Sequence, residues 1–513
     1  MQPEFDDFPL LASARRSWDA HQLDDALNLF MAAVESRPRN VKALLEGARA
    51  FGLRYEILRA EEWIDRVARL AGSDPRVTSL VAQTYRLIHR PQRALELLER
   101  LHLDGQLAPD MLAELAMLYE QTNQVDRGVQ LIRECIAQAP QAPEPLLVLA
   151  RLLRRAGGAT EAGTVLHDLA NRPEAHPMLL VQVWGELCQL RDRQGDYDGA
   201  VAAIENAKGI LRAMPEAQRL ARQALANNDV LGQLYADLTP ATLDAWAAES
   251  LPPDSRCGGI AHLLGFPRSG TTLLEQALGA HPGLADSPER PIFSRDIFRA
   301  MYAPAGSGRP DLATLSAIPL EHLVLQRTRY VDYMEAALGE PIAGRVHLDK
   351  NPNHTSLTAG LFRLFPESRF VVALRDPRDV LVSVYLRNFN LTEFSACFLT
   401  WGSSCLIYGF EMTVWLRMRE LLRDNWLEVR YEDVVEDLEG ESRRTLSFLG
   451  LEWDPAVLRY RELSPQKVVN SPSHDTVRQP VHRHAVGRWR HYARHIEPYL
   501  DRLQPFVDVF GYR

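Results

Sequence analysis

The stretch Gly265-Phe-Pro-Arg-Ser-Gly-Thr-Thr-Leu-Leu274 follows an apolar run, Ile260 to Leu264, and precedes an amphipathic segment. This order predicts a strand, a phosphate-binding loop and the start of a helix. In loops of the pattern G-x-x-x-x-G-K-[ST], backbone amides bind phosphate oxygens and the lysine reaches the terminal phosphates. Gly265 and Gly270 keep the glycine spacing, but Thr271 stands at the lysine position. Such a loop suits a ligand with a single charged 5′ group, such as a phosphosulfate, better than a β/γ-phosphate pair.

A second segment also predicts a phosphate site. The run from Arg369 to Leu374 is typical of a short buried strand, and Pro377 then marks the first turn of a helix. Arg375 therefore lies at the carboxyl end of a strand, and Ser383 lies two helical turns further on. A strand-end ion pair between Arg375 and Asp376, or a Walker B-like strand, would explain the same residues. The occurrence of both segments in one chain, in this order, favours a second phosphate site.

These two segments resemble the nucleotide loops of sulfotransferases, in particular the tyrosylprotein sulfotransferases and bacterial tetratricopeptide–sulfotransferase fusions. The resemblance extends from about Ile260 to Trp489. It implies 3′-phosphoadenosine-5′-phosphosulfate as the sulfonate donor, with Arg375 and Ser383 on its 3′-phosphate. It implies no metal, because the leaving group is a phosphate already bound by cations. The residues that it places on the 5′ side of the donor are Pro267, Arg268, Ser269, Gly270, Thr271 and Thr272.

The same resemblance implies three catalytic residues. Lys350 directly follows the predicted strand Arg345–Leu348 in the segment Asp349-Lys-Asn-Pro, which resembles the family's lysine-containing strand end. This lysine would contact the departing bridge oxygen and the sulfonate. Glu289 follows the first helix of the fold, where the family carries its glutamate base, although Pro291 replaces an arginine of the family pattern. Arg268 would stabilise charge on the sulfonyl oxygens. Cytosolic sulfotransferases use a histidine instead, so His354 remains an alternative base, while His281 is better explained as a helix terminator.

Three more residues are candidates for donor binding. Tyr431, in Val-Arg-Tyr-Glu-Asp, matches a recurrent sulfotransferase sequence whose tyrosine lies near the adenine. The segment from Ser473 to Trp489 resembles the cofactor-covering segment of the bacterial fusions. It offers Arg478 or Arg488 as a further contact to the 3′-phosphate. A solvated basic face would explain these arginines equally well, and Tyr431 is equally consistent with a core position.

The first part of the chain has a different pattern. A small residue recurs early in a predicted second helix of each unit, and a proline recurs near the end of each unit, at intervals close to the 34 residues of tetratricopeptide repeats. Five or six repeats should therefore form an α-solenoid over residues 8–215. The small residues are Ala26, Ala94, Gly128, Ala162 and Ala200, with Glu62 out of pattern, and the prolines are Pro38, Pro75, Pro109, Pro140, Pro173 and Pro215.

A cluster of breakers, Leu251-Pro-Pro-Asp-Ser-Arg-Cys-Gly-Gly, suggests a boundary after a helical linker at 216–256. In the remaining part, 257–513, predicted strands alternate with helices, which predicts a parallel sheet with its ligand at the carboxyl ends of the strands. The fold class is therefore an N-terminal tetratricopeptide α-solenoid followed by a P-loop-like parallel α/β sulfotransferase domain. The predicted strands are Ile260–Phe266, Arg345–Leu348, Phe370–Leu374 and Leu427–Tyr431.

Composition narrows the setting. With 513 residues the chain is too long for one core, and a net charge of -9 gives no basic footprint for nucleic acid. Five cysteines without a C-x-x-C pair favour reduced thiols in a cytoplasmic protein. The first residues are acidic and do not show the apolar core of a signal sequence, and no apolar run approaches the length of a membrane span. The family's membrane-anchored members differ in this respect.

The expected reaction is sulfonate transfer from 3′-phosphoadenosine-5′-phosphosulfate to an acceptor hydroxyl. A peptide tyrosine, another protein group and a small hydroxylated molecule all remain open as acceptors, and the solenoid offers a surface for a protein partner. Two other classes compete. A P-loop kinase would require a lysine where Thr271 stands. A non-catalytic tetratricopeptide scaffold with a nucleotide-binding fold would not require Lys350 or Arg268.

Overall fold

The computed structural model describes residues 4–20, 22–72, 74–249, 251–287, 289–305, 308–463 and 483–513. These residues form two compact units. The first is Met1–Ala175 together with Tyr333–Glu340, and the second is His176–Asp332 together with Pro341–Arg513. In the described part of the chain, no helix combines the length and the apolar character that a membrane span requires.

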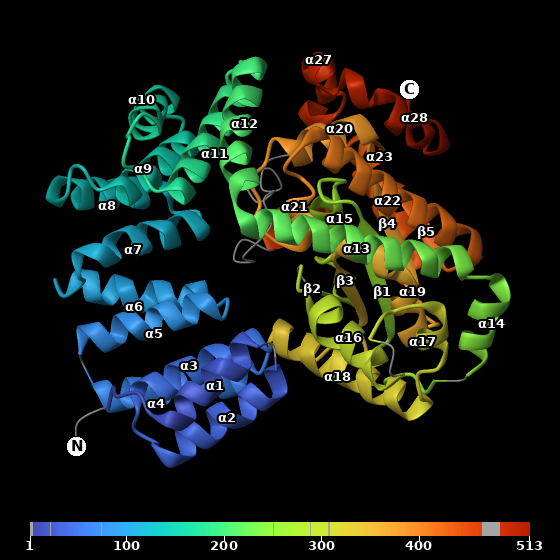
Figure 1. The fold of residues 1–513 in the computed structure, drawn as a ribbon, viewed down its shortest axis with the longest axis horizontal. Coiled ribbons are helices and arrows are strands. Elements are labelled where there is room, and N and C mark those ends of the chain that lie inside the picture. The colour runs from blue at the N-terminus through green and yellow to red at the C-terminus, as the bar shows by residue number, and fades with distance from the viewer. Residues whose placement is uncertain are drawn as a thin grey trace. The chain divides into compact units, whose positions relative to one another are not determined.

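The first unit consists of antiparallel helix pairs (Figure 1). A sixth pair of the same kind, α11 (Pro177–Arg193) and α12 (Tyr197–Ala213), groups with the second unit. Over the described residues the first helices of successive pairs begin 32, 34, 34, 34 and 34 residues apart, which confirms the predicted repeat. The helices of the first unit are α1 (Pro9–Asp19), α2 (Leu23–Ser36), α3 (Val41–Leu53), α4 (Ile57–Ala71), α5 (Pro75–Leu87), α6 (Pro91–Leu103), α7 (Pro109–Gln121), α8 (Val125–Gln138), α9 (Pro143–Ala156) and α10 (Ala159–Ala170).

Small residues allow the two helices of a pair to pack closely. Each predicted small residue is the fourth residue of its second helix, and the alanines among them are fully buried. In α4 that position belongs to Ala60, which is also fully buried, whereas Glu62 is exposed. The second repeat therefore follows the same pattern as the others, with Ala60 as its small residue. Several of the predicted prolines, such as Pro75 and Pro109, begin the next helix, because proline lacks the amide hydrogen that a first helical turn does not use.

The second unit is built on a five-stranded parallel sheet in the order β2-β3-β1-β4-β5. The chain adds β2 and β3 on one side of β1 and then β4 and β5 on the other, so the strand order reverses between β1 and β4. Ligands of such sheets bind beside the carboxyl ends of the strands at this reversal. The strands are β1 (Gly259–Gly265), β2 (Leu284–Ser287), β3 (Val346–Lys350), β4 (Arg369–Leu374) and β5 (Trp426–Arg430). Sequence reasoning located all of them except β2.

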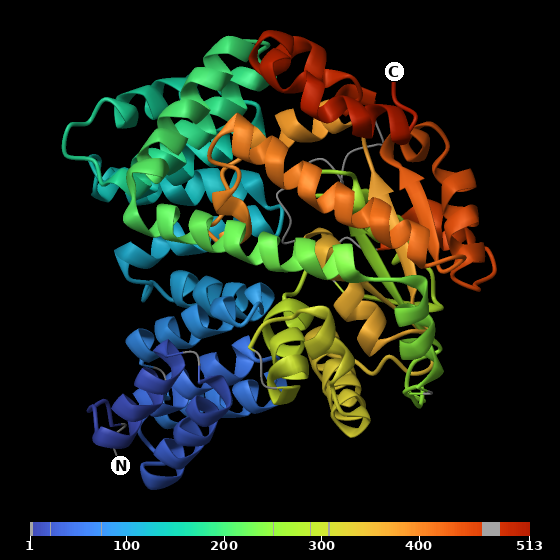
Figure 2. The same ribbon diagram turned by 45° about the vertical axis from the view of Figure 1, so that its right-hand side comes forward.

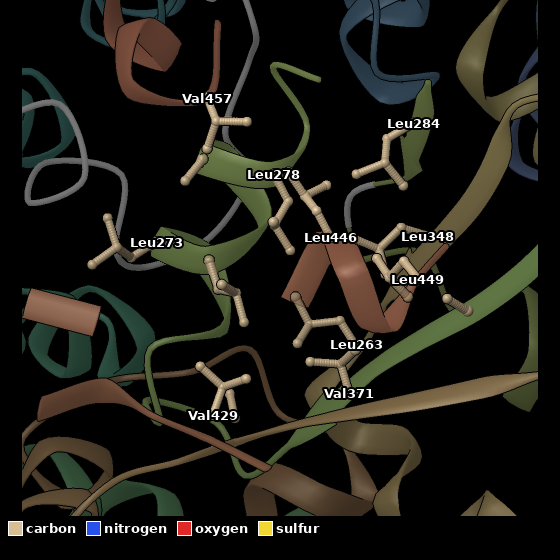
Figure 3. Close-up of a cluster of buried hydrophobic side chains, with 14 of the residues drawn as sticks. Leu263, Leu273, Leu278, Leu284, Leu348, Val371, Val429, Leu446, Leu449 and Val457 are labelled. Carbon is tan, nitrogen blue, oxygen red and sulfur yellow. The ribbon is translucent and has the colours of Figure 1, made fainter. Parts of the chain in front are cut away.

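Successive residues of the central strands point to opposite faces of the sheet, and both faces are buried. Leu263 of β1, Leu348 of β3 and Val371 of β4 pack on one face with residues of α15 and α24 (Figure 3). On the other face, His262 of β1 stacks on Phe370 at a ring separation of 5.4 Å. Burial on both faces is what a parallel sheet requires.

Helices flank the sheet and continue from the sixth helix pair. The expected linker contains α13 and α14, and Figure 2 shows α13 (green) running beside α22 (orange). The longer helices of the second unit are α13 (Pro215–Asp237), α14 (Pro240–Ala248), α15 (Thr271–Leu278), α18 (Leu320–Leu338), α19 (Thr358–Leu364), α20 (Pro377–Tyr385), α22 (Trp401–Leu421), α23 (Tyr431–Glu436), α24 (Leu438–Phe448) and α28 (Leu500–Val509). Shorter helical segments are η1 (Ile292–Ile297), α16 (Phe298–Tyr302), α17 (Leu312–Ser316), η3 (Pro352–Leu357), α21 (Glu393–Ala396), η4 (Pro455–Arg459), α25 (Tyr460–Leu463), η5 (Arg483–Ala485), η6 (Arg488–Tyr492) and α27 (Ala493–Ile496).

Candidate active site

The loop between β1 and α15 is shaped by two glycines. Gly265 has φ of 138°, and a Cβ there would lie 2.5 Å from the carbonyl oxygen of Ala373 on β4. Gly270 has φ of 93°, and its Cβ would lie 2.6 Å from the ring of Tyr431. Only glycine tolerates both the conformation and the close approach. The loop is therefore fixed against β4 on one side and Tyr431 on the other.

Arg268 connects the two predicted phosphate segments. Its backbone is left-handed, with φ of 74°, a conformation that a non-glycine residue adopts only when its surroundings enforce it. Its Nε donates to Ser383 Oγ at 3.1 Å, and Arg375 Nη1 donates to the Arg268 carbonyl at 3.2 Å. Residues 115 positions apart in the chain thus meet at the junction of β1 and β4.

The remaining loop residues and Ser383 are buried at the same strand ends. Pro267, Ser269, Thr271 and Thr272 have little exposed surface, and the two threonines open α15. Ser383 is 4% exposed and lies on α20, the helix that follows Arg375. Asp376 caps that helix by accepting from the amide of Arg378 at 2.9 Å.

Several guanidinium groups gather around Arg268. Burial lowers the pKa of Arg268, and the positive charges of Arg387, Arg375 and Arg488 lower it further. An arginine remains protonated in proteins. Arg375 and Arg488 each have a carboxylate partner, Asp379 at 3.8 Å and Asp192 at 2.5 Å. Arg387 lies just after the end of α20, and sequence reasoning did not single it out.

The segment around Arg488 is anchored on α20. Asp379 accepts hydrogen bonds from the amides of Gly487 and Trp489, both at 2.7 Å, and Arg375 donates to the carbonyl of Ala485. Arg488 itself pairs with Asp192 of α11 at 2.5 Å. The structure thus brings Arg488 into the neighbourhood of Arg375. Arg478, the other predicted arginine, lies outside the described residues.

Tyr431 begins α23 directly after β5 and packs on the loop. Its ring contacts the position where a Gly270 side chain would be, and the Arg375 guanidinium lies 5.0 Å from the ring centroid. Burial raises the pKa of Tyr431. The tyrosine is therefore a wall of the site, in contact with both phosphate segments.

Lys350, the last residue of β3, lies between two carboxylates. Its Nζ is 2.8 Å from Glu289 Oε1 and 3.0 Å from Glu275 Oε2. Glu275 lies on α15 and was not identified from the sequence, because no spacing rule connects it to a lysine 75 positions away. Both carboxylates raise the pKa of Lys350 and outweigh the opposing effect of its burial. Lys350 is therefore an ammonium group at the end of the strand next to the loop.

His354, the alternative base, occupies a closed position. It is 1% exposed; its Nε2 lies 3.2 Å from Ser294 Oγ and its Nδ1 lies 4.0 Å from Asp349 Oδ2. Burial lowers the pKa of His354 to about 3, which makes it a weak proton acceptor near neutral pH. His281 follows α15, where Nδ1 accepts from the amide of Gly283 at 3.0 Å. That bond is a turn contact, as the sequence suggested.

These groups can bind two separated anionic groups and move a proton. The loop after β1 and the residues after β4 are adjacent, because the two strands pair in parallel register. Lys350 lies on the other side of β1, since β1 also pairs with β3. An ammonium and a partly exposed carboxylate thus stand beside the strand that leads into the loop. This is the arrangement that group transfer to a hydroxyl requires.

Comparisons with known proteins identify the family of this chain. Residues 262–455 match the model of the sulfotransferase family. Protein-tyrosine sulfotransferase 2 of Gallus gallus is 30% identical over 272 residues, 48% of this chain and 70% of the relative. Protein-tyrosine sulfotransferase A of Caenorhabditis elegans is 25% identical, over 48% of this chain and 66% of the relative. The solved sulfotransferase domain of the Synechococcus PCC 7002 olefin synthase has a TM-score of 0.33 and 22% identity, over 47% of this chain and 90% of that one. The chain belongs to the sulfotransferase family.

Proposed function

We propose that the protein transfers a sulfonate group from 3′-phosphoadenosine-5′-phosphosulfate to an acceptor hydroxyl, with a peptide tyrosine as the first acceptor to test. The observation that carries this proposal is the hydrogen bond between Arg268 and Ser383, which joins the 5′ and 3′ phosphate segments in one site. The adjacent guanidinium groups of Arg375, Arg387 and Arg488 fit a ligand with anionic groups at both ends.

The donor, when bound, supplies a sulfonate on a phosphate leaving group. Glu289 is placed to accept the acceptor's proton, because its side chain is 31% exposed and so can meet a hydroxyl that enters from solvent. Lys350 is placed to meet the negative charge that develops on the bridging oxygen. Arg268 and the loop amides are placed to stabilise the sulfonyl oxygens. These positions support the proposed catalytic roles of Glu289, Lys350 and Arg268.

The donor contacts are assigned in the same way. Pro267, Ser269, Gly270, Thr271 and Thr272 form the loop for the 5′ group, and Arg375 with Ser383 receives the 3′-phosphate. Tyr431 forms the wall on the nucleoside side, and Arg488 adds positive charge from the anchored C-terminal segment. A kinase mechanism is disfavoured because Thr271 occupies the position of the phosphate-binding lysine.

Sulfonate transfer is tested with the full-length protein, a ³⁵S-labelled donor and a panel of tyrosine peptides, saccharides and small phenols. Glu289→Gln should lower kcat by roughly 10²–10⁴-fold, because the amide cannot accept the proton. Its binding of 3′-phosphoadenosine-5′-phosphate should hardly change. Near-normal turnover with an acceptor of ordinary pKa would remove Glu289 from the base role and make His354 the next residue to replace.

The roles of Glu289 and Lys350 can be separated by the choice of substrate. The defect of Glu289→Gln should shrink with a more acidic acceptor hydroxyl, which needs less help to lose its proton. The defect of Lys350→Ala should shrink with a donor analogue that carries a better leaving group. Two defects that respond identically to both changes would contradict the assignment.

We also infer that the helix repeats bind a protein partner or a protein acceptor, as solenoid surfaces commonly do. A cytoplasmic location is proposed from the cysteine pattern, with all five cysteines present as free thiols. Cell fractionation with an antibody tests the location, and recovery in a membrane or secreted fraction would overturn it.

A further inference from the structure

The two carboxylates on Lys350 differ in their surroundings. The side chain of Glu289 is 31% exposed, whereas those of Glu275 and Lys350 are 4% and 2% exposed. Only Glu289 can therefore meet an acceptor from solvent. Glu275 contacts the lysine from inside the fold.

Glu275 is attached to the phosphate loop through one turn of helix. It follows Thr271 by four residues, and Thr271 opens α15 immediately after the loop. Residues four apart lie on the same face of a helix. The position of the Glu275 carboxylate is therefore fixed relative to the site for the donor's 5′ group, and through Glu275 so is the Lys350 ammonium.

The charges around Glu275 come from three neighbouring segments. Lys350 of β3 attracts it, while Asp286 of β2 and Glu289 after β2 repel it. Burial, together with these two acids, raises the pKa of Glu275 to about 7 against the opposing effect of Lys350. Lys350 touches two of these carboxylates, Glu275 and Glu289. When one of the two gains a proton, the other still balances the charge of the lysine.

Proton transfer to Glu289 changes this balance. The acceptor's O–H bond breaks and its proton goes to Glu289, which becomes neutral. The acceptor oxygen bonds to sulfur, the bond from sulfur to the bridging oxygen breaks, and that oxygen keeps the electron pair. Without Glu275, the buried ammonium of Lys350 would lose its carboxylate partner during this step, and an unpaired buried charge is strongly unfavourable.

We propose that Glu275 is a positioning residue that holds the Lys350 ammonium at the end of β3 while Glu289 accepts the acceptor's proton. The inference rests on the proposed sulfonate transfer. Glu275 contacts neither substrate in this account, and it acts only through Lys350. It makes the lysine available to the bridging oxygen at the moment when Glu289 no longer carries a charge.

The test is the kcat of Glu275→Gln, measured on the full-length protein with the labelled donor and with a donor analogue that carries a better leaving group. We expect kcat to fall roughly 10- to 100-fold, because a misplaced Lys350 meets the bridging oxygen poorly. In this variant Lys350 pairs with Glu289 alone. The loss should shrink with the analogue, as it should for Lys350→Ala, because both variants weaken the same contact of the ammonium with the bridging oxygen.

Two further variants separate positioning from folding. Glu411→Gln replaces another buried glutamate, 1% exposed on α22, whose Oε2 accepts from the amide of Ser356 at 2.8 Å. This control should keep a near-normal kcat with both donors. Glu275→Asp keeps the charge on a shorter side chain, so its kcat should lie between those of the wild type and Glu275→Gln. If Glu275→Gln does not fold, the aspartate variant carries the test through a lower kcat with unchanged binding of 3′-phosphoadenosine-5′-phosphate.

The outcomes are distinct for the two claims. A lower kcat whose defect is equally large with both donors, or a wild-type kcat in both Glu275 variants, would overturn the positioning role while leaving sulfonate transfer intact. The proposed function would instead be rejected if the wild-type protein binds 3′-phosphoadenosine-5′-phosphate but transfers no sulfonate to any acceptor of the panel.

Discussion

At the scale of single residues, the site depends on contacts that permit no side chain. Gly270 combines a left-handed φ with contact to the Tyr431 ring, which in turn lies beside the Arg375 guanidinium. Gly270→Ala should therefore displace Tyr431 and the loop together, and weaken binding of 3′-phosphoadenosine-5′-phosphate by roughly tenfold or more. The backbone strain alone costs about 1 kcal/mol or more. Calorimetric titration measures the loss of affinity, and a thermal melt measures the strain.

The matched control is Gly209→Ala in α12, where the nearest atom, at 3.8 Å, is the end of the flexible Arg212 side chain. If Gly270→Ala binds the nucleotide as tightly as the wild type, the loop does not bind this ligand.

At the scale of elements, helix α12 is bonded to α20 and the segment after it. Lys208 of α12 is 2% exposed, donates to the carbonyl of Phe398 and lies 3.9 Å from the ring centroid of Tyr385. Burial lowers the pKa of Lys208 to about 7, from 10.5 in the unfolded chain. Between these values the unfolded state binds a proton that the folded state lacks, so this group makes the folded state more stable as pH rises.

The free energy of unfolding of Lys208→Met should therefore exceed that of the wild type most near pH 7. This difference should shrink toward pH 10, by up to about 1 kcal/mol per pH unit. Chemical denaturation at several pH values measures the difference between the two proteins. Lys42→Met is the control, because the Lys42 side chain is 41% exposed. A difference between wild type and Lys208→Met that does not change with pH would contradict the buried, neutralised state of Lys208.

The same scale shows which elements the sequence could predict. The strands β1, β3, β4 and β5 and the 34-residue helix pairs were recognisable because apolar runs and small residues recur with the periods of their secondary structure. Strand β2 was missed because Leu284–Ser287 is only four residues long. Glu62 was placed out of pattern because Ala60, two residues earlier, holds the buried position. Glu275 and Arg387 were missed because their significance arises from side chains brought near by folding, which local spacing does not reveal.

At the scale of the whole molecule, the sixth helix pair belongs with the site. Asp192 of α11 holds Arg488, Gln189 donates to the carbonyl of Leu386 at 2.8 Å, and Asn388 donates to the carbonyl of Val181 at 2.7 Å. These bonds connect α11 to the end of α20, the helix that carries Ser383. The pair α11–α12 therefore has a structural role at the donor site in addition to being the last of the repeats.

Two truncations test this division of roles. A protein that begins at residue 176 should keep binding 3′-phosphoadenosine-5′-phosphate, while its KM for a protein acceptor should rise if the first unit recruits that acceptor. A protein that begins at residue 216 should lose affinity for the nucleotide as well, because α20 and Arg488 lose the contacts of α11. Circular dichroism checks that both fold. If the longer protein keeps the wild-type KM for the acceptor, the first unit has another role. If the shorter protein keeps full affinity for the nucleotide, α11–α12 does not support the donor site.

The most direct test of the central claim is calorimetric comparison of 3′-phosphoadenosine-5′-phosphate with ATP on the full-length protein. Arg375 and Ser383 should select the 3′-phosphate, which ATP lacks, so the 3′-phosphorylated nucleotide should bind at least ten times more tightly. Loss of one charge-assisted contact in Arg375→Ala should cost on the order of 1.5–3 kcal/mol. The variant should bring the two nucleotides close to equal affinity. Equal binding of ATP and 3′-phosphoadenosine-5′-phosphate by the wild type, or no effect of Arg375→Ala, would contradict the account.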